Sequence, residues 1–461
     1  MQRRRLLGIA TLTFTLSSSL VLASSLGACS SSSPEASTPV VNDAGSSTIS
    51  DAAPLVDADN GAPSSQYPAP HPALANVGTF GGPVLTAPRV IPVFFPGDEY
   101  QTQIETFLHQ LAASGDWAAT TSEYGVGPLT VAPSVVLATA PAATVSDADV
   151  EALAQQVALG AAALQAGDGG APDAGAPDQN SMYAIFYPTS TTISEGPGYD
   201  SCHSFGGYHA ATSVTTSAGA TNVVYAPIPR CPDFYASEGL VGVDEVTAGL
   251  SHELVEAATD PLSNTNAAYL AADDDHKVWG VVLGASETGD MCSWEVPSTN
   301  KPTGIDFQTS RIWSNAAALA GHDPCQPAPS DPYFASIPDL TEEVSIPEYA
   351  EYGANGKPVI GGKTKGIQLA VGESKTIDLM LYSDGPTSSP WSIMPQEVSS
   401  TPVLSLALDR QSGTNGERLH LTVTRNAKSP AGHGATFILY SYIGVPSSSS
   451  RMSLSMVYVA D

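Results

Sequence analysis

The feature that most restricts the fold is a change in sequence pattern at Pro327-Ala328-Pro329. Before this point, apolar residues recur at helical spacing in some segments and alternate as in strands in others. After it, the helical spacing disappears and short β-type runs alternate with turn residues. The pattern predicts the α+β class: a mixed α/β domain over residues 67–330, followed by an all-β domain over residues 331–461.

The all-β prediction rests on short strand-like runs separated by turns such as Ser383-Asp384-Gly385-Pro386 and Gly413-Thr414-Asn415-Gly416. Regular spacing of this kind predicts an Ig-like β-sandwich of about 110 residues. The runs are Gly366–Val371, Ser374–Tyr382, Leu404–Leu408, Arg418–Val423, Ala435–Tyr442 and Met452–Val459.

In the first domain, the apolar run Arg89–Phe95 predicts a strand, and Pro92 within it favours an edge position because proline cannot donate a ladder hydrogen bond. Ser146 is expected to cap a helix from Asp147 to about Gln165. The other expected elements are a helix containing Ile104, Phe107, Leu108 and Leu111, and strands over Pro128–Leu137, Met182–Tyr187 and Asn222–Ile228.

The N-terminus has the pattern of an export signal. Arg3-Arg4-Arg5 precede an apolar stretch, which ends on Leu26-Gly27-Ala28-Cys29. Small residues before a cysteine are typical of a bacterial lipoprotein signal, here residues 1–28, after which Cys29 is acylated. An ordinary secretory signal with a chance cysteine is the alternative. Acylated Cys29 would anchor the protein to the membrane.

Ser30 replaces the aspartate expected for inner-membrane retention, which favours lipid anchoring at the outer membrane. Residues 29–66 are rich in Ser, Ala and Pro and have no apolar period, so a disordered tether is expected.

The charge balance restricts the partners. The chain has 17 Lys+Arg against 46 Asp+Glu, a formal net charge of −29. Such a surface repels phosphate backbones and excludes nucleic acid binding, whereas it concentrates cations.

Besides Cys29, four cysteines remain: Cys202, Cys231, Cys292 and Cys325. An even number in an exported chain predicts two disulfides, for which three connectivities exist. The nearest-neighbour pairing, Cys202 with Cys231 and Cys292 with Cys325, is preferred. A zinc site made of cysteines is disfavoured because no C-x2-C pair occurs.

The strongest chemical signal is a helical segment carrying His252, Glu253 and Glu256. Residues four apart lie on one helix face, so His252 and Glu256 are placed as two metal ligands, with Glu253 as the general base of a hydrolase. The arrangement resembles a zinc metallohydrolase helix with its second histidine replaced by glutamate. Gly249, one turn earlier, leaves room for another segment to approach. The alternative is a solvated acidic helix face.

The third ligand is expected from the turn that carries Glu287 and Asp290, provided that a disulfide fixes it. Asp260 lies about 12 Å along the helix axis from His252, so it is expected to support the site or to serve as an alternative ligand. His209, in a glycine-rich loop, is a further candidate imidazole, as is His203.

The ligand set determines the expected chemistry. Zinc bound by neutral histidines lowers the pKa of its water to about 7, whereas a glutamate ligand weakens this effect. Hydrolysis with Glu253 as the base therefore stays open. Ligation by carboxylates alone would favour calcium and a structural role.

Several motifs occurring in order resemble the Exordium-like, phosphate-induced family of secreted proteins, together with bacterial lipoproteins that share their core. The resemblance covers roughly Gly78 to Cys325 and excludes the C-terminal domain. Plant members often have asparagine where this chain has Asp260. The matching motifs are Gly81–Thr86, Cys202 with Gly206–His209, Tyr225-Ala226-Pro227 with Cys231-Pro232, Ser251–Glu256 with Thr259-Asp260-Pro261, and Glu287–Cys292.

The resemblance implies a secreted or cell-surface protein with a zincin-like core, and plant members are linked to growth and cell-wall responses. Two hypotheses follow. One is a lipid-anchored exterior metallohydrolase that acts on a protein substrate. The other is a non-catalytic surface protein with a structural site at the same residues, which binds cell-wall polysaccharide or a protein.

Overall fold

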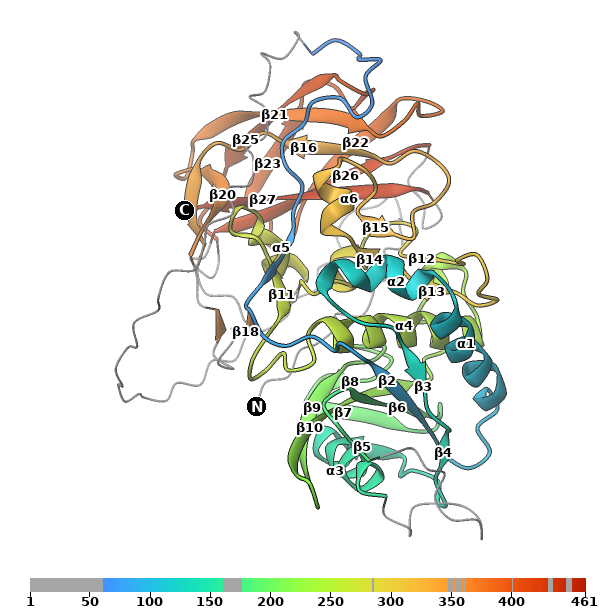
Figure 1. The fold of residues 1–461 in the computed structure, drawn as a ribbon. Helices are drawn as coiled ribbons and strands as arrows, with labels where there is room; N and C mark the ends of the chain where they lie inside the picture. Colours follow the sequence, from blue (N-terminus) through green and yellow to red (C-terminus); the bar gives the residue numbers. More distant parts are fainter. Residues whose placement is uncertain are drawn as a thin grey trace, which may run out of the picture.

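The computed structural model describes residues 61–160, 176–283, 286–346, 351–352, 358–359, 362–399, 401–429, 434–444 and 450–461. The predicted signal peptide, Cys29 and most of the tether lie outside these residues. Helices and a mixed sheet form one part of the molecule, and two β-sheets form the other (Figure 1). The α+β class predicted from the sequence is therefore confirmed.

A mixed sheet of six strands organises the first part. Its order is β3-β2-β6-β10-β9, with β4 also pairing with β2; β2, β6 and β10 are mutually parallel, and β9 is antiparallel to β10. The strands are β2 (Arg89–Phe94), β3 (Thr130–Val131), β4 (Val135–Val136), β6 (Ser181–Tyr187), β9 (Ala210–Thr216) and β10 (Gly219–Pro229).

Helices cover both faces of this sheet, because alternate residues of each strand point to opposite sides. Val90 and Phe94 of β2 pack in the same core as helices α1 and α4, whereas Ile91 and Val93 pack with helix α3 on the other face. The helices of the described chain are α1 (Gln101–Ala113), α2 (Asp116–Thr121), α3 (Asp147–Ala158), α4 (Val243–Thr259), α5 (Val278–Leu283) and α6 (Asn315–Leu319).

Three sequence predictions in this part need correction. The single strand expected over Pro128–Leu137 is instead two short strands, β3 and β4, separated by three residues. Strand β2 is not an edge strand, because it pairs with β6 on one side and with β3 and β4 on the other. Pro92 is tolerated there because it falls between the residues paired with β3 and those paired with β4. Helix α3 has the predicted cap at Ser146, yet it ends at Ala158 rather than near Gln165. Gly160 follows with a φ of 66°.

The C-terminal residues form two sheets around a shared apolar core, with strand orders β16-β21-β25-β23 and β17-β20-β27-β26-β22-β24. Each of the six predicted runs coincides with a strand, although the first, predicted over Gly366–Val371, ends at Gln368. The strands are β16 (Phe334–Pro338), β17 (Glu343–Ile346), β20 (Gly362–Gln368), β21 (Ser374–Ser383), β22 (Trp391–Glu397), β23 (Leu404–Leu408), β24 (Ser412–Gly413), β25 (Arg418–Arg425), β26 (Ala435–Tyr442) and β27 (Met452–Ala460).

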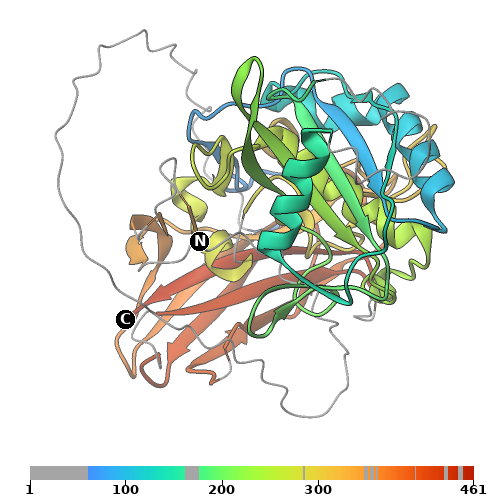
Figure 2. The same cartoon turned by 90° about the horizontal axis from the view of Figure 1, so that it is seen from below.

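The two parts meet through a continuous apolar core. Met291, Cys292 and Trp313 from the first part pack with Leu454 and Met456 of β27. The views in Figures 1 and 2 both place the C-terminal sheets directly against the helices and loops of the first part. The loops that contain Met291, Cys292 and Trp313 therefore pack against the C-terminal sheets.

The N-terminal end of the described chain also lies on the C-terminal sheets. Asn415 accepts a hydrogen bond from the backbone N–H of Ser64 at its carbonyl, and its side chain donates to the carbonyls of Ser64 and Gln66. The last residues of the predicted tether are thus held by specific contacts. Within the described ranges, no helix is long and apolar enough to cross a membrane.

Four short strand pairs and a three-stranded sheet, β5-β7-β8, complete the described structure. Strands β1 and β11 pair beside the N-terminal segment, and β12–β15 lie around the disulfide loop. The bounds are β1 (Val77–Thr79), β5 (Thr144–Ser146), β7 (Thr192–Gly196), β8 (Tyr199–Asp200), β11 (Tyr269–Ala272), β12 (Thr299–Asn300), β13 (Thr309–Ser310), β14 (Ile312–Trp313), β15 (Cys325–Gln326), β18 (Glu351–Tyr352) and β19 (Pro358–Val359).

Candidate metal centre

Helix α4 carries the motif and lies in the centre of the first part. Every residue from Val246 to Thr259 is buried, so the helix has no solvated face. His252, Glu253 and Glu256 are respectively 4, 1 and 2% exposed. The alternative of an acidic helix face in water is therefore wrong. Buried carboxylates need compensating partners, because removing a charge from water is costly.

The turn after α5 brings both predicted carboxylates to helix α4. Glu287 and Asp290 are buried, and the oxygen Oδ1 of Asp290 lies 3.8 Å from Nε2 of His252. The sequence predicted one of these residues at the site, and the structure places both there. The disulfide Cys292–Cys325 fixes the turn, as predicted.

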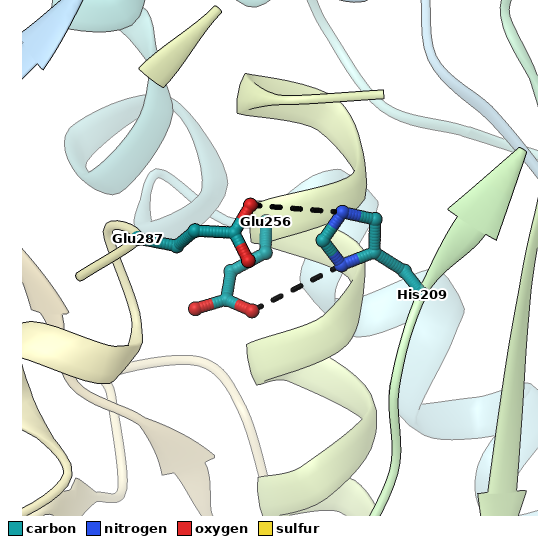
Figure 3. Close-up of side chains that lie close together, drawn as sticks. All are labelled: His209, Glu256 and Glu287. Carbon is teal, nitrogen blue, oxygen red and sulfur yellow. Dashed lines mark ion pairs between the residues drawn. The ribbon is translucent and has the colours of Figure 1, made fainter. Parts of the chain in front are cut away.

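His209 completes the cluster from the other side. It directly precedes β9, and one nitrogen of its imidazole faces the carboxylate of Glu256 while the other faces that of Glu287, as Figure 3 shows. The separations are 4.0 Å from Nδ1 to Oε2 of Glu256 and 3.8 Å from Nε2 to Oε1 of Glu287. The second predicted disulfide, Cys202–Cys231, closes the segment that leads into β9 and the next loop.

Two glycines allow these close approaches. A Cβ added to Gly289 would lie 2.7 Å from Cε1 of His252 and 2.9 Å from Oε1 of Glu256. A Cβ added to Gly207 would lie 3.1 Å from the side chain of Glu253. The backbone therefore packs directly on the candidate ligands, which restricts their positions.

Glu256 is the centre of the arrangement. In the part of the chain that the structure describes, two groups of three residues have potential ligand atoms within 4.8 Å of one another: His209, Glu256 and Glu287, and His252, Glu256 and Asp290. Nitrogen and carboxylate oxygen are ligands that zinc accepts. The donor set thus fits a divalent metal, and Glu256 is common to both groups.

The two oxygens of Glu256 have different surroundings. Oε1 accepts hydrogen bonds from the backbone N–H groups of Gly289 and Asp290, at 3.2 and 3.0 Å, and lies 3.1 Å from Nε2 of His252. Oε2 faces His209. A ligating carboxylate commonly has one oxygen held by hydrogen bonds while the other binds the ion. This division favours Oε2 as the metal-binding atom.

Asp260 supports the site and does not belong to either group of candidate ligands. It follows α4 as its C-terminal cap, and its carboxylate accepts a hydrogen bond from the backbone N–H of Ala268 at 2.7 Å. Its carbonyl oxygen lies 3.2 Å from Nε2 of His209. Because a carbonyl only accepts, this contact assigns a proton to Nε2 and leaves Nδ1 of a neutral imidazole free to bind an ion.

The electrostatics of the cluster follow from its burial and mixed charge. Burial alone would lower the pKa of His209, but the carboxylates of Glu287 and Glu253 outweigh it and raise this pKa to about 10. His252 behaves in the same way beside Glu256, with its pKa raised to about 10. Burial would raise the pKa of Glu256, but the two histidines lower it. The buried carboxylates thus strongly favour positive charge at His209 and His252, whether it is carried by a proton or by a metal ion.

Glu253 differs from its neighbours. Burial raises its pKa, although His209 and His252 partly oppose the rise. Among the described residues, neither of its oxygens has a hydrogen-bond donor, and Oε2 is 3.7 Å from Nδ1 of His209, too long for a direct bond. A carboxyl group held in this way is a candidate proton acceptor.

A narrow pocket reaches this carboxyl group. It is lined by Gly207, Tyr235, Gly249, His252 and Glu253, among others, and its volume of about 20 Å³ holds roughly one water molecule. Gly249 leaves space as predicted, since a Cβ there would be 3.7 Å from the hydroxyl of Tyr235. The cluster is thus open on the side of Glu253.

The sequence analysis identified most of the candidate ligands but gave too little weight to one of them. His209 was only an alternative, and its closeness to Glu256 depends on the position of β9 in the sheet, which local sequence does not show. His203, the other candidate imidazole, is exposed and outside the cluster. Tyr235 was not identified, and only its position shortly after Cys231 could have indicated it.

Comparisons of this chain with models of protein families, with curated proteins and with solved structures give no match. The functional argument therefore rests on the site itself.

Proposed function

We propose that the protein is an exported, lipid-anchored hydrolase that depends on a divalent metal, zinc being the first candidate. Oε2 of Glu256 would bind the ion together with His209 and Glu287. His252 and the backbone N–H of Asp290 would hold the other oxygen of Glu256, Oε1, and so orient the ligand. This assignment is supported by the two groups of potential ligands that share Glu256.

The observation that carries the catalytic proposal is the position of Glu253. It is a buried carboxyl group without a hydrogen bond, and it lies in a pocket with room for one water molecule beside the candidate ligands. A bound divalent ion would supply Lewis acidity and lower the pKa of a water molecule. Glu253 would take the proton from this water and transfer it to the leaving group.

The substrate class first expected is a peptide, because the helix resembles that of zinc peptidases and the chain is predicted to be exported. We further propose that the first domain is zincin-like, that the C-terminal sheets are an Ig-like sandwich, and that the chain belongs with the Exordium-like proteins. The lipid on Cys29 would hold it at the outer membrane.

A structural metal site in a surface protein that binds polysaccharide is the second candidate. Burial of all the candidate ligands and the small size of the pocket favour it. Calcium is the ion expected in that case if the carboxylates of Glu256, Glu287 and Asp290 bind it without the histidines, since oxygen ligands suit calcium.

Metal analysis separates these proposals. The chain would be expressed without residues 1–28, with Cys29→Ser to prevent acylation and without a histidine tag, and its metal content measured by mass spectrometry. We expect about one zinc per chain in the wild type and in Glu253→Gln, and none in Glu256→Ala. No bound metal after addition of zinc would refute the proposal.

Catalysis needs a second measurement on the same proteins. A library of internally quenched peptides should be cleaved by the zinc-loaded wild type and not by zinc-loaded Glu253→Gln. Bound metal with no cleavage by either protein would support the structural alternative. His209→Ala and Asp290→Asn test the ligand assignment: the first should lose zinc, whereas the second should retain it with weaker affinity.

A further inference from the structure

Glu256 belongs to both groups of candidate ligands in the described chain, and the proposed ion uses one group alone. That ion would lie at Oε2, which faces His209. The other oxygen, Oε1, faces His252, and Asp290 completes the second group. All of these residues are buried. A carboxylate with further donors at each of its two oxygens is placed to bridge two metal ions.

The ring nitrogen Nε2 of His252 is a buried polar atom without a hydrogen bond. The side chain is 5% exposed, and among the described residues Nε2 has no hydrogen-bond partner. It lies close to Oε1 of Glu256, but the two atoms do not have hydrogen-bond geometry. A buried polar atom without a bond is costly, and a neutral imidazole nitrogen is a common metal ligand. An ion at Nε2 would therefore satisfy this atom.

The separations in the second group fit a single ion. Nε2 of His252 is 3.1 Å from Oε1 of Glu256 and 3.8 Å from Oδ1 of Asp290. Two ligands of a tetrahedral zinc ion, each bound at about 2.0–2.2 Å, are roughly 3.4 Å apart. The two observed separations lie on either side of this value and differ from it by less than about 0.5 Å. Small side-chain rotations are thus sufficient for an ion to contact all three groups.

The charge of the cluster also accommodates a second ion. Glu253, Glu256, Glu287 and Asp290 are respectively 1, 2, 2 and 5% exposed. When ionised, these four side chains carry four negative charges in a region removed from water, and one divalent ion compensates half of them. A second divalent ion would compensate the rest, while the histidines bind as neutral ligands.

The pocket at Glu253 gives the second group a path to solvent. His252, Glu253 and Gly289 all line it, and its volume of about 20 Å³ holds roughly one water molecule. A zinc ion with three protein ligands commonly has water in its fourth position. The second group thus offers three protein donors and a neighbouring solvent position.

We propose that the centre binds two divalent metal ions and that Glu256 bridges them. Oε2 would bind the first ion with His209 and Glu287. Oε1 would bind the second ion with His252 and Asp290, and this ion would replace the direct contact between His252 and Oε1. The inference rests on the proposed function, because it adds a second ion to the same centre.

The two ions would differ in affinity. Oε1 of Glu256 already accepts hydrogen bonds from the backbone N–H groups of Gly289 and Asp290, whereas Oε2 faces His209. The second ion would therefore bind more weakly, and protein purified without added zinc would carry about one ion. Two ions in such a site are about 3.5–4 Å apart and together stabilise the attacking and leaving groups of a hydrolysis.

Equilibrium dialysis of the whole chain against rising concentrations of free zinc, followed by metal analysis, tests this proposal. The protein would again carry Cys29→Ser and lack residues 1–28 and a histidine tag. We expect about two ions per chain at saturation in the wild type, but about one in His252→Ala and in Asp290→Asn. His203→Ala is the matched control and should bind about two, because His203 is exposed and outside the cluster.

Cobalt(II) tests whether the two ions share Glu256. The electron paramagnetic resonance signal of the first cobalt ion should weaken when the wild type takes up a second, because ions bridged by a carboxylate are magnetically coupled. This loss should be absent in His252→Ala. Circular dichroism would confirm that each variant is folded; should neither His252→Ala nor Asp290→Asn fold, the coupling in the wild type decides.

The outcomes separate this inference from the proposed function. A single ion at saturating zinc overturns the two-ion centre and leaves the proposed function standing. A second ion that folded His252→Ala and Asp290→Asn both retain, or two cobalt ions without coupling in the wild type, has the same consequence. Absence of any bound ion refutes both proposals.

Discussion

A single methyl group at Gly289 should disrupt the metal centre without straining the backbone. Gly289 has a φ of −82° and a ψ of −43°, which alanine adopts readily. Its added Cβ would lie 2.7 Å from Cε1 of His252, whereas carbon atoms in contact are about 3.5 Å apart. The imidazole or the turn must therefore move by about 0.8 Å, and Glu256, 2.9 Å from the same position, must also adjust.

Two effects of Gly289→Ala follow from this displacement. Overpacking in a buried region costs about 1–3 kcal/mol, so the free energy of unfolding of the metal-free protein should fall by this amount. Metal sites tolerate shifts of only about 0.2 Å in ligand distance, so the affinity for zinc should fall at least about tenfold. Chemical unfolding in the presence of a chelator measures the first effect, and competition with a zinc-binding dye measures the second.

Gly115→Ala is the matched control. Gly115 also has helical backbone angles, with a φ of −76°, and its added Cβ would meet no atom within 4 Å. This variant should unfold with nearly the wild-type free energy, or be slightly more stable because alanine restricts the unfolded chain. The reasoning is refuted if Gly289→Ala binds zinc like Gly115→Ala, because the contacts of His252 and Glu256 would then not govern the metal.

Three further predictions use other features. Gly249→Ala should raise the free energy of unfolding by about 0.5–1 kcal/mol, as measured by urea denaturation, because alanine favours a helix interior and its Cβ meets no atom closer than 3.7 Å. Burial and the charge of Asp323 raise the pKa of Glu295 from its usual value of 4.5 to about 8. Between pH 4.5 and about pH 8, the side chain is therefore protonated in the folded state and ionised in the unfolded state. The free energy of unfolding should therefore fall as the pH rises through this range. Glu295→Gln should reduce this fall in unfolding curves recorded from about pH 5 to 8. An equal fall in the variant and the wild type would exclude Glu295 as its source. Loss of the Cys292–Cys325 disulfide, which spans 33 residues, should cost about 3–4 kcal/mol in the same denaturation assay, and no loss would argue against the entropic account.

The local patterns predicted the elements well and their environments less well. The helix with His252 and Glu256 was identified because residues four apart lie on the same helix face. The disulfides were identified because each cysteine was assigned to its nearest neighbour in the sequence. The burial of α4 on all sides was not predicted. Its amphipathic pattern resembles that of a surface helix, whereas segments distant in the sequence enclose its polar side: the turn with Glu287 and Asp290, the segment before β9, and β13, whose Ser310 N–H donates to Ser251.

The missed strands have a similar explanation. Strands β16 and β22 contain Pro338 and Pro395, which weaken a strand prediction, and β17 has only four residues. Their positions depend on pairing with strands that are distant in the sequence, such as β21 for β16 and β26 for β22. Sequence periodicity reports which face of a strand is apolar, and it does not report which partner covers that face.

The position of the C-terminal sheets changes how the metal centre should be understood. The turn that carries Glu287 and Asp290 continues into Cys292 and Glu295, and the carboxylate of Glu295 accepts a hydrogen bond from the backbone N–H of Leu454 in β27. Val296 pairs with Met452 of the same strand. A fragment ending near residue 330 would lose these contacts and expose the core between the two parts. The C-terminal sheets thus stabilise the turn that carries Glu287 and Asp290. Metal binding by this protein should therefore be measured on the whole chain.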